Sequence, residues 1–387
     1  EFVTEVLKLD KQRLWVTIYE EDDEAGELWA SLTDVLPGRI LKMGADENYW
    51  SMGDTGPCGP CSEIHYYLGD DVDGQSEEEF RKDDGTYVEI WNLVFMQFNR
   101  SADGKLDPLP NPSIDTGMGF ERVAAILQGK ISNYDSDLIR PIIALCEELS
   151  GFSYDGSSYE VRDLRADKDY ARDVAMRVLA DHSRAAAFLI GDGVLPGSDG
   201  RGYVLRRIIR RAVRHARVLE LSEPILKSTV GLVVEMYGDV YPALAEHAEK
   251  IVRVVDAEEQ KFYETLDAGL IVLQKAVKEL DGEKTFPGQT AFLLHDTYGF
   301  PVDLTEDALK AYGMQVDLPA FEEAMAEQKA RSRDDRKSRG VEFVAQSFDA
   351  PETIFMGYET TTATSRIADV VFPEDKTQAG PGEHLSL

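Results

Sequence analysis

Residues that could bind an amino acid and a nucleotide gather toward the end of the segment 89–122. Asp115, Gly117 and Gly119 form a tight turn before a short helical pattern that carries Arg122 in its first turn. A carboxylate on a constrained turn can hold an ammonium group, and glycines let a backbone approach a flat ligand because they lack a Cβ. The planar guanidinium of Arg122 can lie against an adenine or pair with a phosphate. Gly-x-Gly alone is a weak signal, so a strand, a capping Asp and a surface Arg explain the same pattern.

Two extended segments and a helix are needed to position these residues. Residues 89–100 are apolar, aromatic and β-branched, which predicts a buried strand. An Asp-Gly turn follows within 101–104. Three prolines keep the return segment extended, because proline disfavours helix at the residue before it; they are Pro108, Pro110 and Pro112. Residues 120–127 then have the pattern of a helix.

The segment 46–63 is rich in Gly and Pro, so we expect a loop there rather than regular structure. Trp50 lies in this segment, where it could wall a ligand pocket or belong to the core. Cys58, Cys61 and His65 suggest a zinc site, but a structural zinc site needs four ligands and only three are in view. We therefore predict no metal site and treat both thiols as structural.

The other predicted elements are strands near the start of the chain and helices after it. Strands are expected at 13–19 and 39–43, with an acidic helix at 22–32 between them. Helices are expected at 133–149, 173–191 and 201–217, twice within 230–280, and at 320–339. From residue 341, short β-rich segments between Gly and Pro turns resemble the opening of a β-barrel.

The segment 201–217 holds the densest positive charge of the chain. Its apolar residues recur at helical spacing, which predicts an amphipathic helix with a wide basic face. The arginines are Arg201, Arg206, Arg207, Arg210, Arg211, Arg214 and Arg217. Such a face could contact RNA phosphates, or it could be neutralised by acidic residues from elsewhere in the fold.

Composition limits the class of protein. A chain of 387 residues is long enough for two or three domains. Its net charge of −31 argues against a surface that binds nucleic acid everywhere, so any RNA contact must come from a local basic patch. No apolar run approaches the roughly 20 residues of a membrane span. Three cysteines fit a reducing compartment better than a disulfide framework, so we predict a cytoplasmic protein without membrane association.

Five long runs resemble the class II aminoacyl-tRNA synthetases, and among them the alanine-specific family, in the order of that family. The runs are 50–64, 89–100, 114–122, 202–215 and 296–305, and Gly117 to Arg122 resembles the third class II signature motif. The resemblance implies an alanine–tRNA ligase. It would use ATP and Mg²⁺ to convert alanine to alanyl-adenylate and pyrophosphate, and would then transfer the alanyl group to the 3′ end of tRNA(Ala).

The resemblance also implies roles for single residues. Alanine would be bound by Trp50, Asn92 and Asp115, and ATP by Trp50, Ile90, Trp91, Asn92, Gly119 and Arg122. Asp115 and Arg122 would be the catalytic residues. The tRNA acceptor stem would be contacted by Arg206, Arg207, Arg210, Arg211, Arg214 and Asp296. Ser198 stands where the family often has an Asn that reads the acceptor stem, so that contact is left unassigned.

The fold class implied by the resemblance is α+β, with a partial class II antiparallel sheet and helices. We predict the later part of the catalytic domain in 1–128, a helical tRNA-recognition domain in 129–340 and the start of an editing-domain β-barrel in 341–387. The first two class II motifs are not found before Trp15, so we expect an internal fragment. Zinc is expected only in an editing region whose motifs this sequence lacks. A non-catalytic RNA-binding module is the alternative function.

Overall fold

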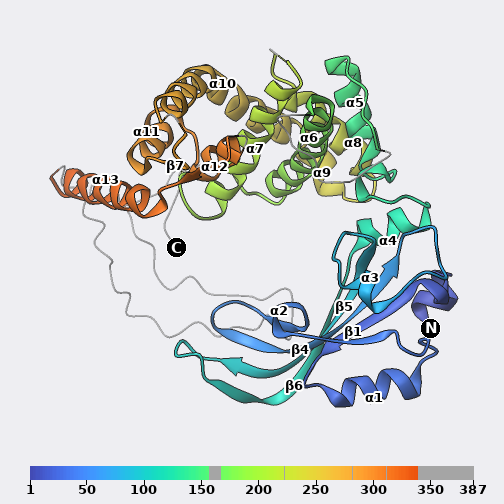
Figure 1. Cartoon of the computed structure of the whole chain (residues 1–387). Coiled ribbons are helices and arrows are strands. Elements are labelled where there is room, and N and C mark those ends of the chain that lie inside the picture. Colours follow the sequence, from blue (N-terminus) through green and yellow to red (C-terminus); the bar gives the residue numbers. More distant parts are fainter. Residues whose placement is uncertain (157–166, 222, 281, 311, 339–387) are drawn as a thin grey trace, which may run out of the picture. The chain divides into compact units, whose positions relative to one another are not determined.

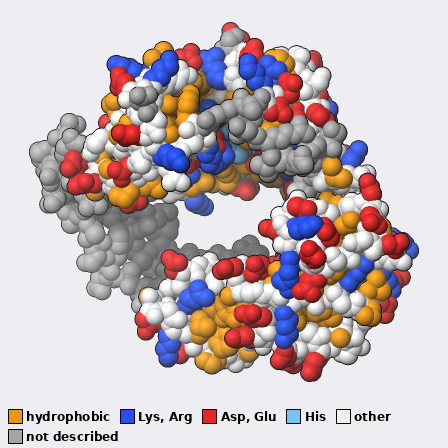
Figure 2. Space-filling model, in the orientation of Figure 1, with side chains coloured by type: hydrophobic (Ala, Val, Ile, Leu, Met, Phe, Trp, Pro, Cys, Tyr) orange, Lys and Arg blue, Asp and Glu red, His pale blue; other side chains and the backbone are white. Residues whose placement is uncertain are grey.

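The computed structural model describes residues 1–156, 167–221, 223–280, 282–310 and 312–338 (Figure 1). Contacts within the chain divide it into two units, 1–321 and 322–387. The β-barrel predicted from residue 341 lies outside the described residues. Within the described part, no helix combines the length and the apolar character that crossing a membrane requires. On the face drawn in Figure 2, acidic and basic side chains are intermixed rather than gathered by sign.

A six-stranded, mostly antiparallel sheet forms the first part of the chain, which confirms the α+β fold class. The strands are β1 (Leu14–Tyr19), β2 (Ile40–Met43), β3 (Tyr49–Ser51), β4 (Gly56–Tyr67), β5 (Tyr87–Arg100) and β6 (Leu106–Met118). Their order is β2-β1-β4-β5-β6, and β3 pairs with the first half of β4. Within this sheet, only the described strands β1 and β2 run parallel. The predicted hairpin of β5 and β6 is confirmed, and β6 forms an exposed edge.

Short helices cover both faces of this sheet. They are a π-helical turn (Phe2–Val6), a 3₁₀ turn (Lys11–Arg13), α1 (Asp23–Leu32), α2 (Ala45–Asn48), α3 (Glu77–Phe80) and α4 (Phe120–Leu127). One apolar cluster joins Val3 and Val123 to Ile64 and Ile90 of the sheet. The predicted strand 89–100 is less buried than expected, since only Ile90 and Val94 of β5 are buried.

The loop predicted for 46–63 is wrong, because this segment forms α2, β3 and the first half of β4. The register of β4 against β5 shifts between Cys58 and Cys61. A Cβ on Gly59 would overlap the carbonyl oxygen of Phe95, so the strands can approach this closely only at a glycine. Proline is tolerated inside a sheet at such irregularities, which explains Pro60. The Gly and Pro residues therefore mark a bulged strand pair and not a loop.

Helices make up most of the remaining described chain. They are α5 (Arg140–Ser150), α6 (Lys168–Gly191), α7 (Gly200–Val218), α8 (Leu226–Tyr237), α9 (Pro242–Glu246), α10 (Ala248–Glu279), α11 (Gly288–Tyr298), α12 (Val302–Lys310) and α13 (Leu318–Ser338). A 3₁₀ turn (Asn133–Asp135) precedes α5, and β7 (Thr285–Phe286) pairs with β8 (Gln315–Val316). Helices α6, α7, α8 and α10 pack together around a fully buried core that includes Met176, Leu205, Val230 and Val255 (Figure 1).

Most predicted helices are present, but their boundaries shift for local reasons. The helix expected at 133–149 begins only at Arg140, because Ser132 caps a separate 3₁₀ turn instead. The helix expected from residue 173 begins at Lys168, where the Asp167 side chain accepts a hydrogen bond from the Tyr170 amide. Pro242 starts an additional short helix, so three helices stand where two were expected.

Candidate functional site

The strand register places three of the predicted binding residues on one face of the sheet. Asn92 of β5 lies directly opposite Gly117 of β6, and Asp115 is two residues before Gly117. Residues directly opposite each other, and residues two apart along a strand, point to the same face. Glu63 of β4 lies opposite Asn92, and Thr17 of β1 lies opposite Glu63. A row of four positions therefore crosses the sheet, and Asp115 lies diagonally from Asn92 at its end.

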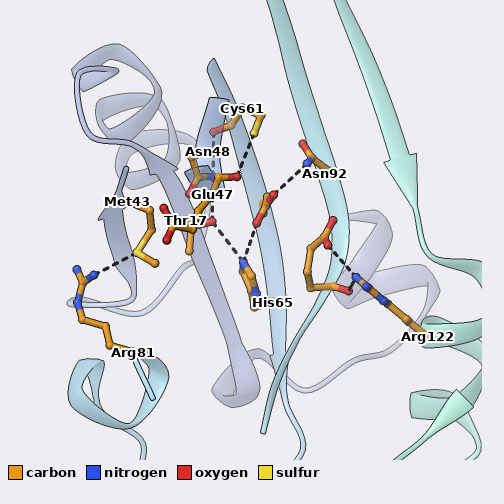
Figure 3. Close-up of polar contacts among 11 residues, drawn as sticks. Thr17, Met43, Glu47, Asn48, Cys61, His65, Arg81, Asn92 and Arg122 are labelled. Atoms are coloured by element: carbon orange, nitrogen blue, oxygen red, sulfur yellow. Dashed lines mark hydrogen bonds and ion pairs between the residues drawn. The ribbon is translucent and has the colours of Figure 1, made fainter. Parts of the chain in front are cut away.

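The side chains of this row form a hydrogen-bonded network (Figure 3). Asn92 Nδ2 donates to Glu63 Oε1 at 3.0 Å, and the other carboxylate oxygen of Glu63 lies 3.2 Å from His65 Nε2. His65 Nε2 is also 3.3 Å from Thr17 Oγ1, which accepts a hydrogen bond from Asn48 Nδ2 at 3.1 Å. The remaining amide oxygen of Asn92 is buried and has no hydrogen-bond partner among the described residues. The network thus ends in a buried acceptor that no described residue satisfies.

Arg122 is held beside this row by an ion pair. Its Nη1 donates to the Glu89 carbonyl oxygen at 2.6 Å and lies 2.7 Å from Glu89 Oε2. Glu89 stands opposite His65 in the register, so the pair lies next to the polar network (Figure 3). Gly119 caps the helix that carries Arg122, and a Cβ there would come within 3.0 Å of the Arg122 side chain. Gly119 therefore leaves the space that Arg122 occupies.

Asp115 lies exposed within the edge strand β6, so the tight turn predicted from Asp115 is wrong, because the pairing with β5 continues to Met118. Its Oδ1 accepts a hydrogen bond from the Thr116 amide at 2.8 Å. This bond fixes one carboxylate oxygen and leaves the second open to solvent. Asp115 and the Asn92 amide oxygen are therefore two acceptors on one face, which is an arrangement that suits an ammonium group.

The structure does not bring the side chains of Ile90 and Trp91 to this face. Ile90 is almost fully buried in the apolar cluster beneath α4. Trp91 lies opposite Met118, its Nε1 donates to Thr116 Oγ1 at 2.9 Å, and its ring packs edge-on against Phe2. Because Trp91 and Asn92 are adjacent in the strand, their side chains point to opposite faces. A nucleotide contact from Ile90 or Trp91 would need the main chain.

Trp50 of β3 lies beside Cys58 and Cys61, because β3 pairs with the first half of β4, which carries both cysteines. Trp50 is half-buried in β3, opposite Gly59. The sulfur atoms of Cys58 and Cys61 have different neighbours, the Tyr49 hydroxyl and the Glu47 carbonyl, each at 3.9 Å. Burial raises the pKa of Cys61 to about 11, so this thiol stays protonated at neutral pH. In the part of the chain that the structure describes, no group of three His, Cys, Asp or Glu side chains is arranged to hold a metal ion.

A cavity of about 420 Å³ lies beside the polar row. Thr17, Glu63 and His65 line it from the sheet, and Asn48 and Phe80 line it from the flanking helices. The Phe80 ring packs edge-on against the His65 ring at 5.0 Å between centroids. The Phe80 ring therefore packs against the network at His65, and the cavity leaves space beside the network for water or a small ligand.

Six arginines of α7 are paired with acidic residues of α10 and α12. The pairs are Arg206 and Arg210 with Glu258, Arg207 with Asp303, Arg211 and Arg214 with Asp307, and Arg217 with Asp267. Their exposure differs, since the side chains of Arg207 and Arg211 are 40% and 39% exposed. Those of Arg210 and Arg214 are 10% and 15% exposed. Neutralisation within the fold, the second interpretation of this helix, therefore describes its buried arginines best.

The family model for "tRNA synthetases class II (A)" matches residues 1–382. The chain belongs to this family. Curated relatives named "Alanine--tRNA ligase" include that of Methylococcus capsulatus, 49% identical over 333 residues that make up 86% of this chain and 36% of the relative. Those of Chlorobium phaeovibrioides and Wolinella succinogenes are 44% and 45% identical and cover 96% and 99% of this chain, with 41% and 44% of their own lengths matched. The chain spans about two fifths of the length of these relatives.

Asp296 of this class II synthetase chain lies in the last turn of α11, and Arg210 holds the end of that helix. Arg210 Nη1 donates to the carbonyl oxygen of Gly299, the residue that ends α11 in a left-handed conformation (φ 67°). Thr265 Oγ1 donates to the neighbouring carbonyl of Tyr298 at 2.9 Å. Arg210 therefore links the predicted tRNA helix to the element that carries the predicted acidic partner.

Sequence reasoning missed three residues, Glu63, His65 and Glu89, that hold Asn92 and Arg122 of the candidate site in place. Glu63 and His65 lie two positions apart in β4, and Glu89 lies at the beginning of the strand that also carries Asn92. Alternation of polar residues would have put Glu63 and His65 on one face, had the segment been recognised as a strand. The ion pair of Glu89 with Arg122 has no sequence signal, because its members lie on different elements 33 positions apart.

Proposed function

We propose that this chain is part of an alanine–tRNA ligase and carries its alanine site and part of its ATP site. In the first step a carboxylate oxygen of alanine attacks the α-phosphorus of ATP, which forms alanyl-adenylate and releases pyrophosphate. In the second, the 3′-terminal hydroxyl of tRNA(Ala) attacks the carbonyl carbon of the adenylate and AMP leaves. The placement of Asn92 and Asp115 on one sheet face carries the proposal. The names of the relatives support the choice of alanine.

Asn92 and Asp115 would bind the alanine ammonium group from two sides. The Asp115 carboxylate supplies charge, and the buried, unpartnered Asn92 oxygen supplies a second acceptor. Trp50 would limit the size of the pocket, as the family resemblance implies. One extra methylene is worth only about 1–3 kcal/mol in such a pocket, so size alone rejects serine poorly.

Arg122 and Gly119 would bind ATP. The guanidinium edge pairs with Glu89, which leaves its flat face available for an adenine ring. Magnesium is bound mainly through phosphate oxygens with one or two carboxylates. Glu89 is the carboxylate next to Arg122 among the described residues, and it is already paired with that arginine. The phosphate oxygens of ATP would therefore supply most of the magnesium ligands. Catalysis by this chain would rest on positioning and charge neutralisation.

Arg207 and Arg211 would contact phosphates of the tRNA acceptor stem. They are the most exposed of the five α7 arginines predicted to bind tRNA. Arg206, Arg210 and Arg214 would instead hold α7 against its acidic neighbours, and Asp296 would face the RNA from the end of α11. This assignment narrows the predicted phosphate contacts to two side chains.

We also propose a cytoplasmic location. All three cysteines, Cys58, Cys61 and Cys146, are free and buried. Burial raises the pKa of Cys146 to about 12 and that of Cys61 to about 11, so neither forms much of the reactive thiolate. Such cysteines suit a reducing compartment, where no disulfide is required.

Alanine-dependent exchange of labelled pyrophosphate into ATP tests the proposal. The chain should first be shown to be folded by circular dichroism. Exchange with alanine, weaker exchange with serine or glycine, and none with larger amino acids is the expected result. A folded chain that binds tRNA(Ala) without any exchange would identify an RNA-binding module instead.

A further inference from the structure

We propose that Glu63 is a positioning residue for alanine binding. It fixes the orientation of the Asn92 amide, so that the amide oxygen and not the amide nitrogen faces the substrate ammonium group. This inference rests on the proposed function, because it names a determinant of the same alanine site. It concerns a residue that does not itself touch alanine.

The chemistry of a carboxylate decides the orientation of the amide. An ionised carboxylate can only accept hydrogen bonds, so the atom of Asn92 that lies 3.0 Å from Glu63 Oε1 must be the donating Nδ2. The amide oxygen must then point away from Glu63. That oxygen is buried and has no partner among the described residues. A buried acceptor without a partner is unfavourable, so the site favours a ligand that brings a donor.

The surroundings of Glu63 keep its carboxylate in place. Its second oxygen is 3.2 Å from His65 Nε2, and the two side chains are 14% and 12% exposed. His65 is in turn held by Thr17, at 3.3 Å, and by the ring of Phe80. Glu63 therefore has few alternative positions, and Asn92 inherits this rigidity through its hydrogen bond to Glu63, with the Cys61 thiol as a second neighbour of its side chain (Figure 3).

A direct electrostatic role for Glu63 makes a different prediction. If Glu63 acted by its negative charge, glutamine would be as harmful as alanine at this position. If it acts by orienting Asn92, glutamine should substitute, because its amide oxygen can still accept from Nδ2. The glutamine NH₂ group would then face His65, whose Nε2 can accept in its other neutral tautomer.

The experiment compares E63A and E63Q in the full chain. Alanine and ATP binding are measured separately by calorimetric titration. E63A should weaken alanine at least about tenfold and leave ATP within about twofold, as expected for one lost charge-assisted hydrogen bond. E63Q should weaken alanine no more than about threefold. Glu47→Ala is the matched control, since Glu47 lines the same cavity from α2 and should leave alanine binding unchanged.

A second measurement does not depend on alanine. In a ¹⁵N-labelled sample, the side-chain NH₂ protons of Asn92 should exchange slowly with solvent in the wild type and in E63Q, and fast in E63A. Unchanged alanine affinity or unchanged NH₂ protection in E63A would overturn the inference, as would equal losses in E63A and E63Q. Failure of the folded wild-type chain to bind alanine would instead overturn the proposed function, and this inference with it.

Discussion

Replacing Arg210 with Met should destabilise the helical part of the chain by about 3 kcal/mol, because it leaves the buried carboxylate of Glu258 without its main partner. Arg210 Nε and Nη2 lie 2.8 Å and 2.6 Å from Glu258 Oε1, and the two side chains are only 10% and 8% exposed. Removing one partner of such a pair costs about 3–5 kcal/mol, since the remaining charge stays buried. Arg206 lies 3.3 Å from the same carboxylate oxygen and would compensate in part, so the low end of the range is expected.

Urea unfolding followed by circular dichroism measures this loss directly. Arg207→Met is the matched control, because Arg207 is 40% exposed and its pair with Asp303 should contribute about 1 kcal/mol or less. A double variant, Arg210→Met with Glu258→Leu, should regain part of the stability, since it buries no unpaired charge. Binding of tRNA(Ala) separates the two arginines further. Arg207→Met should lower the slope of log K against log salt by about 1, and Arg210→Met should leave it unchanged.

Three results would refute this assignment of roles. Equal stability of the Arg210 and Arg207 variants would show that the Glu258 pair is not structural. A double variant less stable than either single variant would show that the pair is not the origin of the loss. A reduced salt slope in Arg210→Met, at unchanged stability, would make Arg210 an RNA contact.

The remaining predictions concern three other parts of the chain. Asp115→Ala should weaken alanine far more than ATP in equilibrium binding; equal losses would count against an ammonium contact. Gly59→Ala should lower stability to urea by about 3 kcal/mol, because the new Cβ would overlap the Phe95 carbonyl oxygen, and an unchanged midpoint would contradict that close approach. Burial raises the pKa of Glu259 from 4.5 to about 7, although the carboxylate accepts hydrogen bonds from two amides at the start of α8. The folded state thus holds this proton more tightly than the unfolded state, so stability should fall by up to about 3 kcal/mol as pH rises from 4.5 through 7. Glu259→Gln should flatten the unfolding free energy across that pH range; a wild-type slope in the variant would assign the dependence to another group.

Local sequence signals predicted the hairpin that carries the site. The apolar run of β5, the Asp-Gly turn and the spaced prolines of β6 all act over a few residues, so the pattern determines the structure. The segment around Gly59 failed for the opposite reason. Gly and Pro normally mark loops, and only the approach of Phe95, distant in the chain, makes them part of a strand pair.

Two adjacent residues of a strand cannot both point their side chains into one site, because successive side chains alternate between the two faces of the sheet. Asn92 and Trp91 lie in the same matching run, and the resemblance implies a nucleotide contact for both. The register separates them, because Asn92 faces Glu63 whereas Trp91 faces the cluster at the chain start. Alternation would have predicted this separation without a structure. What it could not predict is the buried, unpartnered oxygen of Asn92, whose direction depends on the distant Glu63.

The positive charge of α7 could be counted in the sequence, but the charge that remains after its ion pairs are formed could not. Arg210 and Glu258 are 48 positions apart, and the other acidic partners lie on α10 and α12. Six arginines share four carboxylates among the described residues, and α7 also carries Arg201, so three positive charges remain in excess on this helix. Salt dependence follows the number of phosphates neutralised, so RNA bound by this helix should show a shallow slope, about 3 or less. In a chain of net charge −31, such a small excess cannot hold RNA by charge alone. Affinity for tRNA would then depend on hydrogen bonds, for which the Asp296 carboxylate at the end of α11 is a candidate acceptor.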